Sequence, residues 1–146
     1  MQMKNEMVLE AKKENLQTLL GMIEDTLLEH GAPRKAVMQL CCAAEEIFVN
    51  IASYAYAPET GSAWICLELS EDGSQAELTF SDSGRPYDPL AREDPDVTAP
   101  MEERGIGGLG IFMVKKLTDG ARYEYREGKN VLSLVKNLQK PASRPE

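Results

Sequence analysis

Apolar residues recur at helical spacing through two adjacent segments near the N-terminus, and this pattern constrains the fold more than any other feature. The first segment runs from Asn15 to His30, and Gly31 followed by Pro33 ends it. The second runs from about Pro33 to Ala55, with Pro33 well placed in its first turn. We therefore predict two consecutive amphipathic helices, each with one face committed to a core.

The rest of the chain carries the shorter patterns typical of strands and turns. Strands are expected over residues 7–9, 64–69, 77–80, 121–126 and 131–138, with a further helix over 108–117 and turns at 71–74 and 127–130. Residues 83–104 are proline-rich and irregular, and connections of this length are usually functional. We predict an α+β fold, a two-layer sandwich with helices on one face of a mixed, largely antiparallel sheet. One domain is expected over residues 1–138, followed by a frayed tail over 139–146.

Composition and charge limit the classes of partner. A formal net charge of −8 in 146 residues argues against direct nucleic-acid binding, because such binding relies on Lys and Arg. No apolar run approaches the roughly 20 residues that span a bilayer, and Met1–Glu6 lacks the apolar segment of a signal peptide. Cys41, Cys42 and Cys66 are odd in number and fit reduced thiols better than a disulfide framework. We therefore expect a cytoplasmic protein with no membrane partner.

Glu46 and Asn50 are separated by one helical turn, so their side chains fall on one stripe of the second helix. Magnesium prefers oxygen ligands and often takes one or two protein ligands together with substrate phosphates, which suits an Asn carbonyl. A neighbouring carboxylate that does not bind the metal can accept a proton from an attacking hydroxyl. Taken alone, the same spacing occurs on the polar edge of many ordinary amphipathic helices.

Asp82 follows the strand predicted over residues 77–80 and precedes Gly84. A carboxylate at a strand end can accept a hydrogen bond from the exocyclic amine of adenine, and glycine lets the backbone approach a ring closely. By itself, the segment is also a common Asp-Ser-Gly turn.

Four glycines, Gly105, Gly107, Gly108 and Gly110, lead into the next predicted helix. Glycines there free backbone N–H groups to face phosphates at the helix N-terminus. Three of them also satisfy the dinucleotide-binding pattern G-x-G-x-x-G, but that pattern needs a strand directly before it, and Pro100–Arg104 is charged and proline-led. A Walker A loop is excluded because no Gly-Lys-Ser/Thr triplet follows. A phosphate-binding loop of another type is therefore favoured.

In this order, the three motifs resemble the N, G1 and G2 boxes of the gyrase/Hsp90/histidine-kinase/MutL superfamily, whose members hold ATP with magnesium. More narrowly, Ala44–Asn50 and Asp82–Pro89 resemble the serine kinases that act as bacterial anti-sigma factors (RsbW-like). The second run is similar to the family's acid-x-Gly-x-Pro-aromatic-Asp-Pro pattern, with Tyr87 as the aromatic residue. The resemblance covers nearly the whole chain and implies a Bergerat-type ATP-binding fold.

The resemblance also implies a role for each matching residue. Glu46 would be the general base, Asn50 the magnesium ligand and Asp82 the acid that reads adenine. Gly84 would shape the adenine pocket. The phosphate-binding lid would comprise Gly105, Gly107, Gly108 and Gly110, with Arg104 as a contact to the γ-phosphate or to a partner. Family members often place a basic residue shortly after the metal-ligand Asn, where this chain departs with Ser53-Tyr54-Ala55-Tyr56.

The function that the resemblance implies is phosphorylation by ATP of a serine or threonine on a small antagonist protein of the STAS type. The same protein would bind a sigma factor and form a homodimer. The alternative is a non-catalytic module in which ATP only orders the lid and shapes a partner surface. Glu46 favours the kinase, since a pure binder needs no base at that position.

Overall fold

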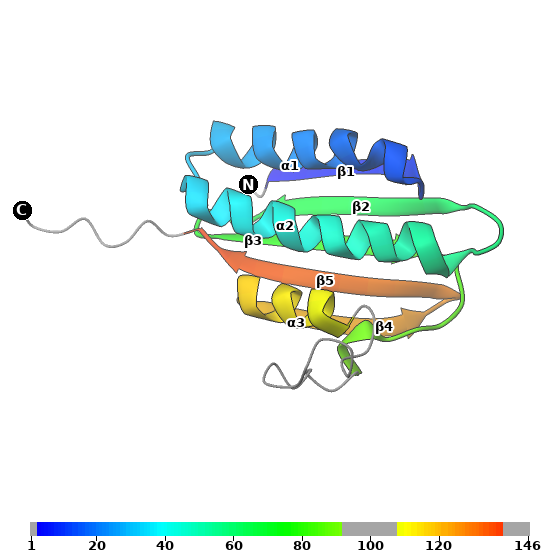
Figure 1. Cartoon of the computed structure of the whole chain (residues 1–146). Helices are drawn as coiled ribbons and strands as arrows, with labels where there is room; N and C mark the ends of the chain where they lie inside the picture. Colours follow the sequence, from blue (N-terminus) through cyan, green and yellow to red (C-terminus); the bar gives the residue numbers. More distant parts are fainter. Residues whose placement is uncertain (1–2, 92–107, 139–146) are drawn as a thin grey trace, which may run out of the picture.

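The computed structural model describes residues 3–91 and 108–138, which form one sheet with helices beside it (Figure 1). The strands are β1 (Met3–Glu10), β2 (Ser62–Leu69), β3 (Gln75–Asp82), β4 (Gly120–Arg126) and β5 (Lys129–Asn137). The α-helices of the described residues are α1 (Leu16–Glu29), α2 (Arg34–Asn50) and α3 (Gly108–Leu117). Short helical turns are η1 (Lys13–Asn15), the π-helical η2 (Ile51–Ala55) that directly continues α2, and η3 (Pro89–Ala91).

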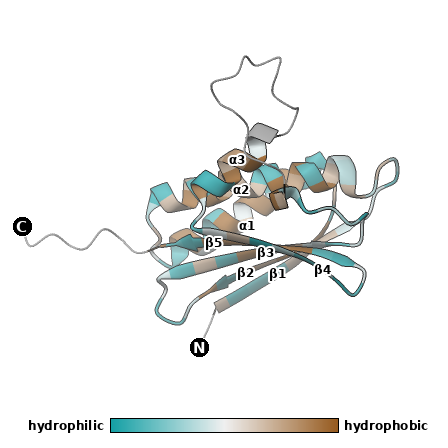
Figure 2. Ribbon diagram, turned by 90° about the horizontal axis from the view of Figure 1, so that it is seen from below, coloured by the Kyte–Doolittle hydropathy of each residue, from teal (hydrophilic) through white to brown (hydrophobic). Residues whose placement is uncertain are grey.

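The sheet has the strand order β1-β2-β3-β5-β4, and every pairing between these described strands is antiparallel. The three α-helices lie side by side on one face of it, with α2 between α1 and α3 (Figures 1 and 2). The predicted two-layer α+β sandwich is therefore confirmed. The sheet is antiparallel throughout the described residues rather than mixed. Two of its four pairings, β2 with β3 and β4 with β5, are hairpins, which are antiparallel by construction.

The core lies between the sheet and the helices. Alternate residues of β3, among them Leu78 and Phe80, point to the helices and have at most 1% of their area exposed. Leu19 of α1 and Leu40 and Phe48 of α2 meet them and are fully buried. The same alternation continues to the end of β3, so Asp82 also points to the helix side. This register places a carboxylate at the edge of an apolar core.

By length and composition alone, Arg34–Ala55 would also pass as a membrane-spanning helix, with 22 residues and an 18-residue stretch whose mean hydropathy is 1.3. No uninterrupted apolar run of that length was expected from the sequence. The apolar residues of α2 form the centre of the core, where Leu40, Ala44 and Phe48 are fully buried. The apolar character of α2 is thus explained by packing within this fold.

Several predicted boundaries moved. The first strand is longer than residues 7–9, because it pairs with β2 along its whole length from Met3 to Glu10. The predicted second helix ends its α-helical course at Asn50 and continues as one π-helical stretch. The last turn is shorter than residues 127–130. Glu127 and Gly128 alone make it, with φ of 54° and 78°, and Asn130 belongs to β5.

Candidate functional site

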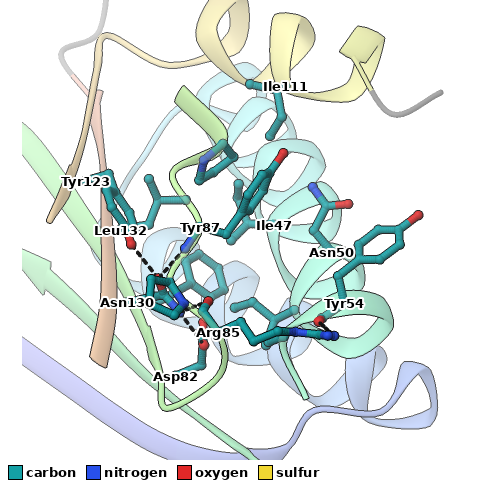
Figure 3. Close-up of a pocket in the computed structure, with 15 residues that line it drawn as sticks. Ile47, Asn50, Tyr54, Asp82, Arg85, Tyr87, Ile111, Tyr123, Asn130 and Leu132 are labelled. Carbon is teal, nitrogen blue, oxygen red and sulfur yellow. Dashed lines mark hydrogen bonds between the residues drawn. The ribbon is translucent and has the colours of Figure 1, made fainter. Parts of the chain in front are cut away.

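A cavity of about 550 Å³ opens between α2, the ends of β3 and β5, and the first turns of α3 (Figure 3). Asn50 and Asp82, two of the residues singled out from the sequence, line it from opposite sides. The other lining residues are mostly apolar or aromatic: Ile47, Ile51, Tyr54, Ala55, Phe80, Arg85, Pro86, Tyr87, Pro89, Ile111, Tyr123, Asn130 and Leu132. An apolar cleft with a few polar groups is the usual form of a small-molecule site.

Asp82 is the buried acid of this cavity, with 5% of its area exposed. Its Oδ1 accepts the Gly84 backbone N–H at 2.9 Å and the Asn130 side-chain amide at 2.9 Å. Within residues 3–91 and 108–138, no hydrogen bond reaches Oδ2, and no buried side-chain oxygen of those residues lacks a partner. Oδ2 is therefore reachable, and the cavity that Asp82 lines supplies the access.

Gly84 is packed against the end of the helical segment that carries Asn50. A side chain at Gly84 would overlap the backbone carbonyl of Ala55, so only glycine fits there. The next residue continues the contact, since the Arg85 backbone N–H donates to the Ala55 carbonyl at 3.1 Å. Gly84 thus lies close to the protein's own backbone, which holds the cavity wall in place. Its approach to a bound ring stays a prediction.

Asn130 was missed by the sequence analysis, which assigned it to a turn. It faces Asp82 directly across the β3–β5 ladder and is 7% exposed. Besides Asp82, its amide group donates to the carbonyls of Arg85 at 2.9 Å and Gly84 at 3.4 Å. No local signal marks this residue, because its contact with Asp82 forms only when β3 pairs with β5. The two residues are 48 positions apart in the sequence.

The oxygen of Asn130 is equally occupied. It accepts the Tyr87 backbone N–H at 3.0 Å and the hydroxyl of Tyr123. Burial raises the pKa of the Tyr123 hydroxyl, and the carboxylates of Asp88 and Asp82 raise it further. The hydroxyl therefore stays protonated at neutral pH and remains a donor to Asn130.

Asn50 ends α2 and is half-buried at the cavity wall. The π-helical stretch after it carries Tyr54, whose side chain is 61% exposed beside the cavity (Figure 3). Arg85 reaches this stretch from the segment after β3, and its guanidinium donates to the carbonyls of Tyr54 at 2.9 Å and Ala57 at 3.0 Å. A cation thus lies beside the stretch where the sequence shows no basic residue.

Glu46 lies one turn before Asn50 and faces α3 rather than the cavity. Its carboxylate is in contact with Gly110, where any side chain would overlap it. Ile111, next to Gly110, does reach the cavity wall (Figure 3). The predicted base and the predicted glycine segment are therefore neighbours, one helical turn away from the predicted metal ligand.

The remaining predicted residues divide between two groups. Gly108 is the first residue of α3, as the sequence predicted. Arg104, Gly105 and Gly107 lie outside the described residues. Their assignment to a phosphate-binding lid stays a prediction.

The described residues contain no group of three or more His, Cys, Asp or Glu side chains that could hold a metal ion. A magnesium ion bound here would therefore rely on the Asn50 carbonyl oxygen together with oxygens of a bound phosphate and water. This is the ligand set that Mg²⁺ commonly adopts with nucleotides. The residues present fit such an ion.

Comparison with known sequences gives a consistent result. The sequence profile of the histidine kinase-like ATPase domain matches residues 9–136. The serine/threonine-protein kinase BtrW of Bordetella bronchiseptica is 30% identical over 115 residues, which are 74% of this chain and 79% of BtrW. The serine-protein kinase RsbW of Listeria monocytogenes is 30% identical over 107 residues, covering 70% of this chain and 67% of RsbW. RsbW of Bacillus cereus is 26% identical over 141 residues, covering 94% and 86%.

The fold also matches a solved structure, that of the RsbU and RsbW domains of Rv1364c from Mycobacterium tuberculosis. The match has a TM-score of 0.70 at 19% identity and covers 96% of this chain and 34% of that chain. At this identity, the match supports the fold alone. It agrees with the sandwich described above.

Proposed function

This chain belongs to the histidine kinase-like ATPase domain family, and on that premise we propose that it is an ATP-dependent protein serine/threonine kinase. We further propose that it acts as an anti-sigma factor, binding a sigma factor and phosphorylating a STAS-type antagonist of that binding. The observation that carries the proposal is the shared cavity of Asn50 and Asp82, with Glu46 one turn before Asn50 on α2. In this proposal the base of the nucleotide lies at Asp82, the phosphates lie near Asn50, and the transferred group lies near Glu46.

The adenine end of the nucleotide would lie at Asp82. Its Oδ2 is the accessible acceptor in an otherwise apolar wall formed by Ile51, Phe80 and Leu132. An amine donor on the ligand satisfies that carboxylate, whereas a carbonyl oxygen at the same place would be repelled by it. The apolar walls would cover the faces of the ring.

The phosphates would extend towards Asn50 and the start of α3. The first turn of a helix offers unpaired N–H groups, and α3 begins with Gly108 and places Ile111 over the cavity (Figure 3). Asn50 would hold magnesium, which when bound neutralises charge on the phosphates of the transferred group. Arg104, Gly105 and Gly107 are proposed to complete the phosphate-binding lid.

Glu46 is proposed as the base that accepts the proton of the attacking serine or threonine hydroxyl. It is close to Asn50 along α2, but its carboxylate lies against Gly110 of α3 rather than in the cavity wall. It can therefore remain free of the metal and still be near the start of α3, where the transferred phosphate is proposed to lie. A positioned base of this kind contributes about 10²–10⁴-fold to a rate. Its presence favours the kinase over a module that only binds ATP.

We also propose a homodimer that forms through the free edge of β1. Within the described residues, β1 pairs only with β2 and ends the sheet. An eight-residue edge strand presents unpaired N–H and C=O groups that favour pairing with a second strand. Light scattering at micromolar concentration tests this, and a monomer mass with and without nucleotide would contradict it.

Isothermal titration of ADP in the presence of magnesium tests the nucleotide site. Wild type should bind, and Asp82→Ala should weaken binding by about 1–3 kcal/mol, because the ligand amine loses its buried acceptor. Asp25→Ala is the matched control, since it removes an equal charge from the exposed face of α1. Binding of NAD but of neither ATP nor ADP would refute the proposal.

Incubation with radiolabelled ATP and a panel of STAS-type antagonist proteins then tests the kinase. Transfer of label to a serine or threonine of one antagonist is expected. Nucleotide binding without transfer to any antagonist, combined with nucleotide-dependent capture of a sigma factor, would favour the non-catalytic alternative.

A further inference from the structure

The bonding partners of Asn130 leave its amide only one orientation. Its Nδ2 faces three acceptors, the Asp82 carboxylate and the carbonyls of Gly84 and Arg85. Its Oδ1 faces a backbone N–H, that of Tyr87, which can only donate. Turning the amide over would set donor against donor and acceptor against acceptor. Asn130 is therefore fixed by the protein and has no group left to offer a ligand.

The fixed amide in turn helps to hold the Asp82 carboxylate in one orientation. Oδ1 receives two donors, from Asn130 and from the Gly84 backbone. Both donors come from groups that cannot accept in their place, because one is a peptide N–H and the other is the oriented amide. The other oxygen of Asp82, Oδ2, is thus held as an acceptor that faces the cavity.

We propose that Asn130 is the positioning residue of this site. Together with the Gly84 N–H, it holds the inner oxygen of Asp82 and so orients the carboxylate. The outer oxygen is then placed to accept a hydrogen bond from a purine with a 6-amino group, which a purine with a 6-oxo group cannot offer. This inference rests on the nucleotide site proposed above. It assigns a role to a cavity-lining residue whose amide bonds to other groups of the protein.

A substitution at Asp82 makes the consequence measurable. In Asp82→Asn, the two inner donors still require an acceptor, so the new side chain must place its oxygen inward. Its nitrogen then takes the outer position and becomes a donor towards the cavity. The variant should therefore favour a 6-oxo purine, and most strongly while Asn130 remains as the second of the two inner donors.

The experiment compares ADP with inosine diphosphate, which carries an oxo group in place of the 6-amine, by isothermal titration with magnesium. Wild type should prefer ADP, and Asp82→Asn should shift the ratio of the two dissociation constants towards inosine diphosphate by about tenfold or more. Asn130→Ala should reduce the wild-type preference. The double variant Asp82→Asn/Asn130→Ala should show less of the shift than Asp82→Asn alone.

Ser133→Ala is the matched control. Ser133 is also buried on β5 and bonds a directly opposed residue of β3, Thr79, at 3.1 Å, but it does not line the cavity. Its ratio of the two dissociation constants should equal that of wild type.

An Asp82→Asn variant that still prefers ADP, or a shift that is unchanged when Asn130 is removed, would overturn this inference alone. A wild type that binds neither nucleotide would overturn the proposed function with it. Because the first of these outcomes needs no substitution at Asn130, the inference can be overturned even if the Asn130 variants do not fold.

Discussion

Gly110 of α3 lies against the carboxylate of Glu46 on α2, so closely that a methyl group on Gly110 would overlap the carboxylate oxygens. The contact joins the two helices at the point where α3 begins. It also gives a physical reason for glycine at this position that is separate from phosphate binding. The absence of a side chain at Gly110 leaves the space that the Glu46 carboxylate occupies.

Gly110→Ala is expected to impair phosphoryl transfer by displacing Glu46. The long Glu46 side chain can move, so the fold should survive, and alanine also favours the helix over glycine. Misplacement of a catalytic group by about 1 Å can lower a rate by about 10²-fold. Transfer rates from radiolabelled ATP should therefore fall further than ADP affinity does. Gly120→Ala is the control, because the nearest atom to a new methyl there, Val135 Cβ, lies at an ordinary contact distance of 3.6 Å.

Glu46→Gln separates chemistry from binding. The amide keeps the size of the side chain but cannot accept the proton of an attacking hydroxyl. Nucleotide affinity should stay near that of wild type, whereas transfer should fall by about 10²–10⁴-fold. Titration and single-turnover transfer on the same preparation measure both. An unchanged rate of transfer to the cognate antagonist would remove Glu46 from the role of base.

Asn50→Ala should behave differently from Glu46→Gln, although the two residues are one turn apart. Loss of the carbonyl oxygen removes the protein's ligand to magnesium, so affinity and transfer should fall together. The magnesium dependence of ADP binding should also weaken. Two small and similar effects, each within roughly 0.5 kcal/mol, would instead describe an ordinary polar flank of a helix.

The parts of the site that the sequence predicted are those set by local geometry. Glu46 and Asn50 share a stripe because a helix repeats every 3.6 residues. The strand pattern that ends just before Asp82 predicts that this residue lies at a strand end. Asn130 required the β3–β5 register, which joins residues 48 positions apart. The contact of Arg85 with Tyr54 required the π-helical continuation of α2, which no local pattern in the sequence signals. Long-range pairing and local helix distortion account for what was missed.

Gly84→Ala and Gly21→Ala should change stability in opposite directions. A methyl group at Gly84 would overlap the backbone of Ala55, which cannot rotate away as a side chain can. We expect a loss of about 1–3 kcal/mol in the free energy of unfolding and weaker ADP binding.

Gly21 lies on the exposed side of α1 with nothing within 4 Å of a new methyl group. Alanine there should stabilise the helix by about 0.5–1 kcal/mol. Urea denaturation followed by circular dichroism measures both, and equal effects would refute the close approach at Gly84.

The adjacent cysteines of α2 should differ in their reactivity towards iodoacetamide. Burial raises the pKa of the Cys41 thiol to about 11, and the charges of Glu24 and Cys42 contribute in the same direction. A raised pKa keeps the thiol protonated, so at pH 8 only about one Cys41 in a thousand is the reactive thiolate. Cys42 is exposed on the outer side of the helix, where the reagent has free access.

Peptide mapping after brief labelling at pH 8 should find Cys42 modified and Cys41 intact. Labelling of Cys41 should rise about tenfold for each pH unit between 8 and 10, because the thiolate fraction does so below the pKa. Equal labelling of both thiols in the folded protein would contradict the packing of α2 against α1. In urea, equal labelling is expected, since unfolding removes the burial that raises the pKa of Cys41.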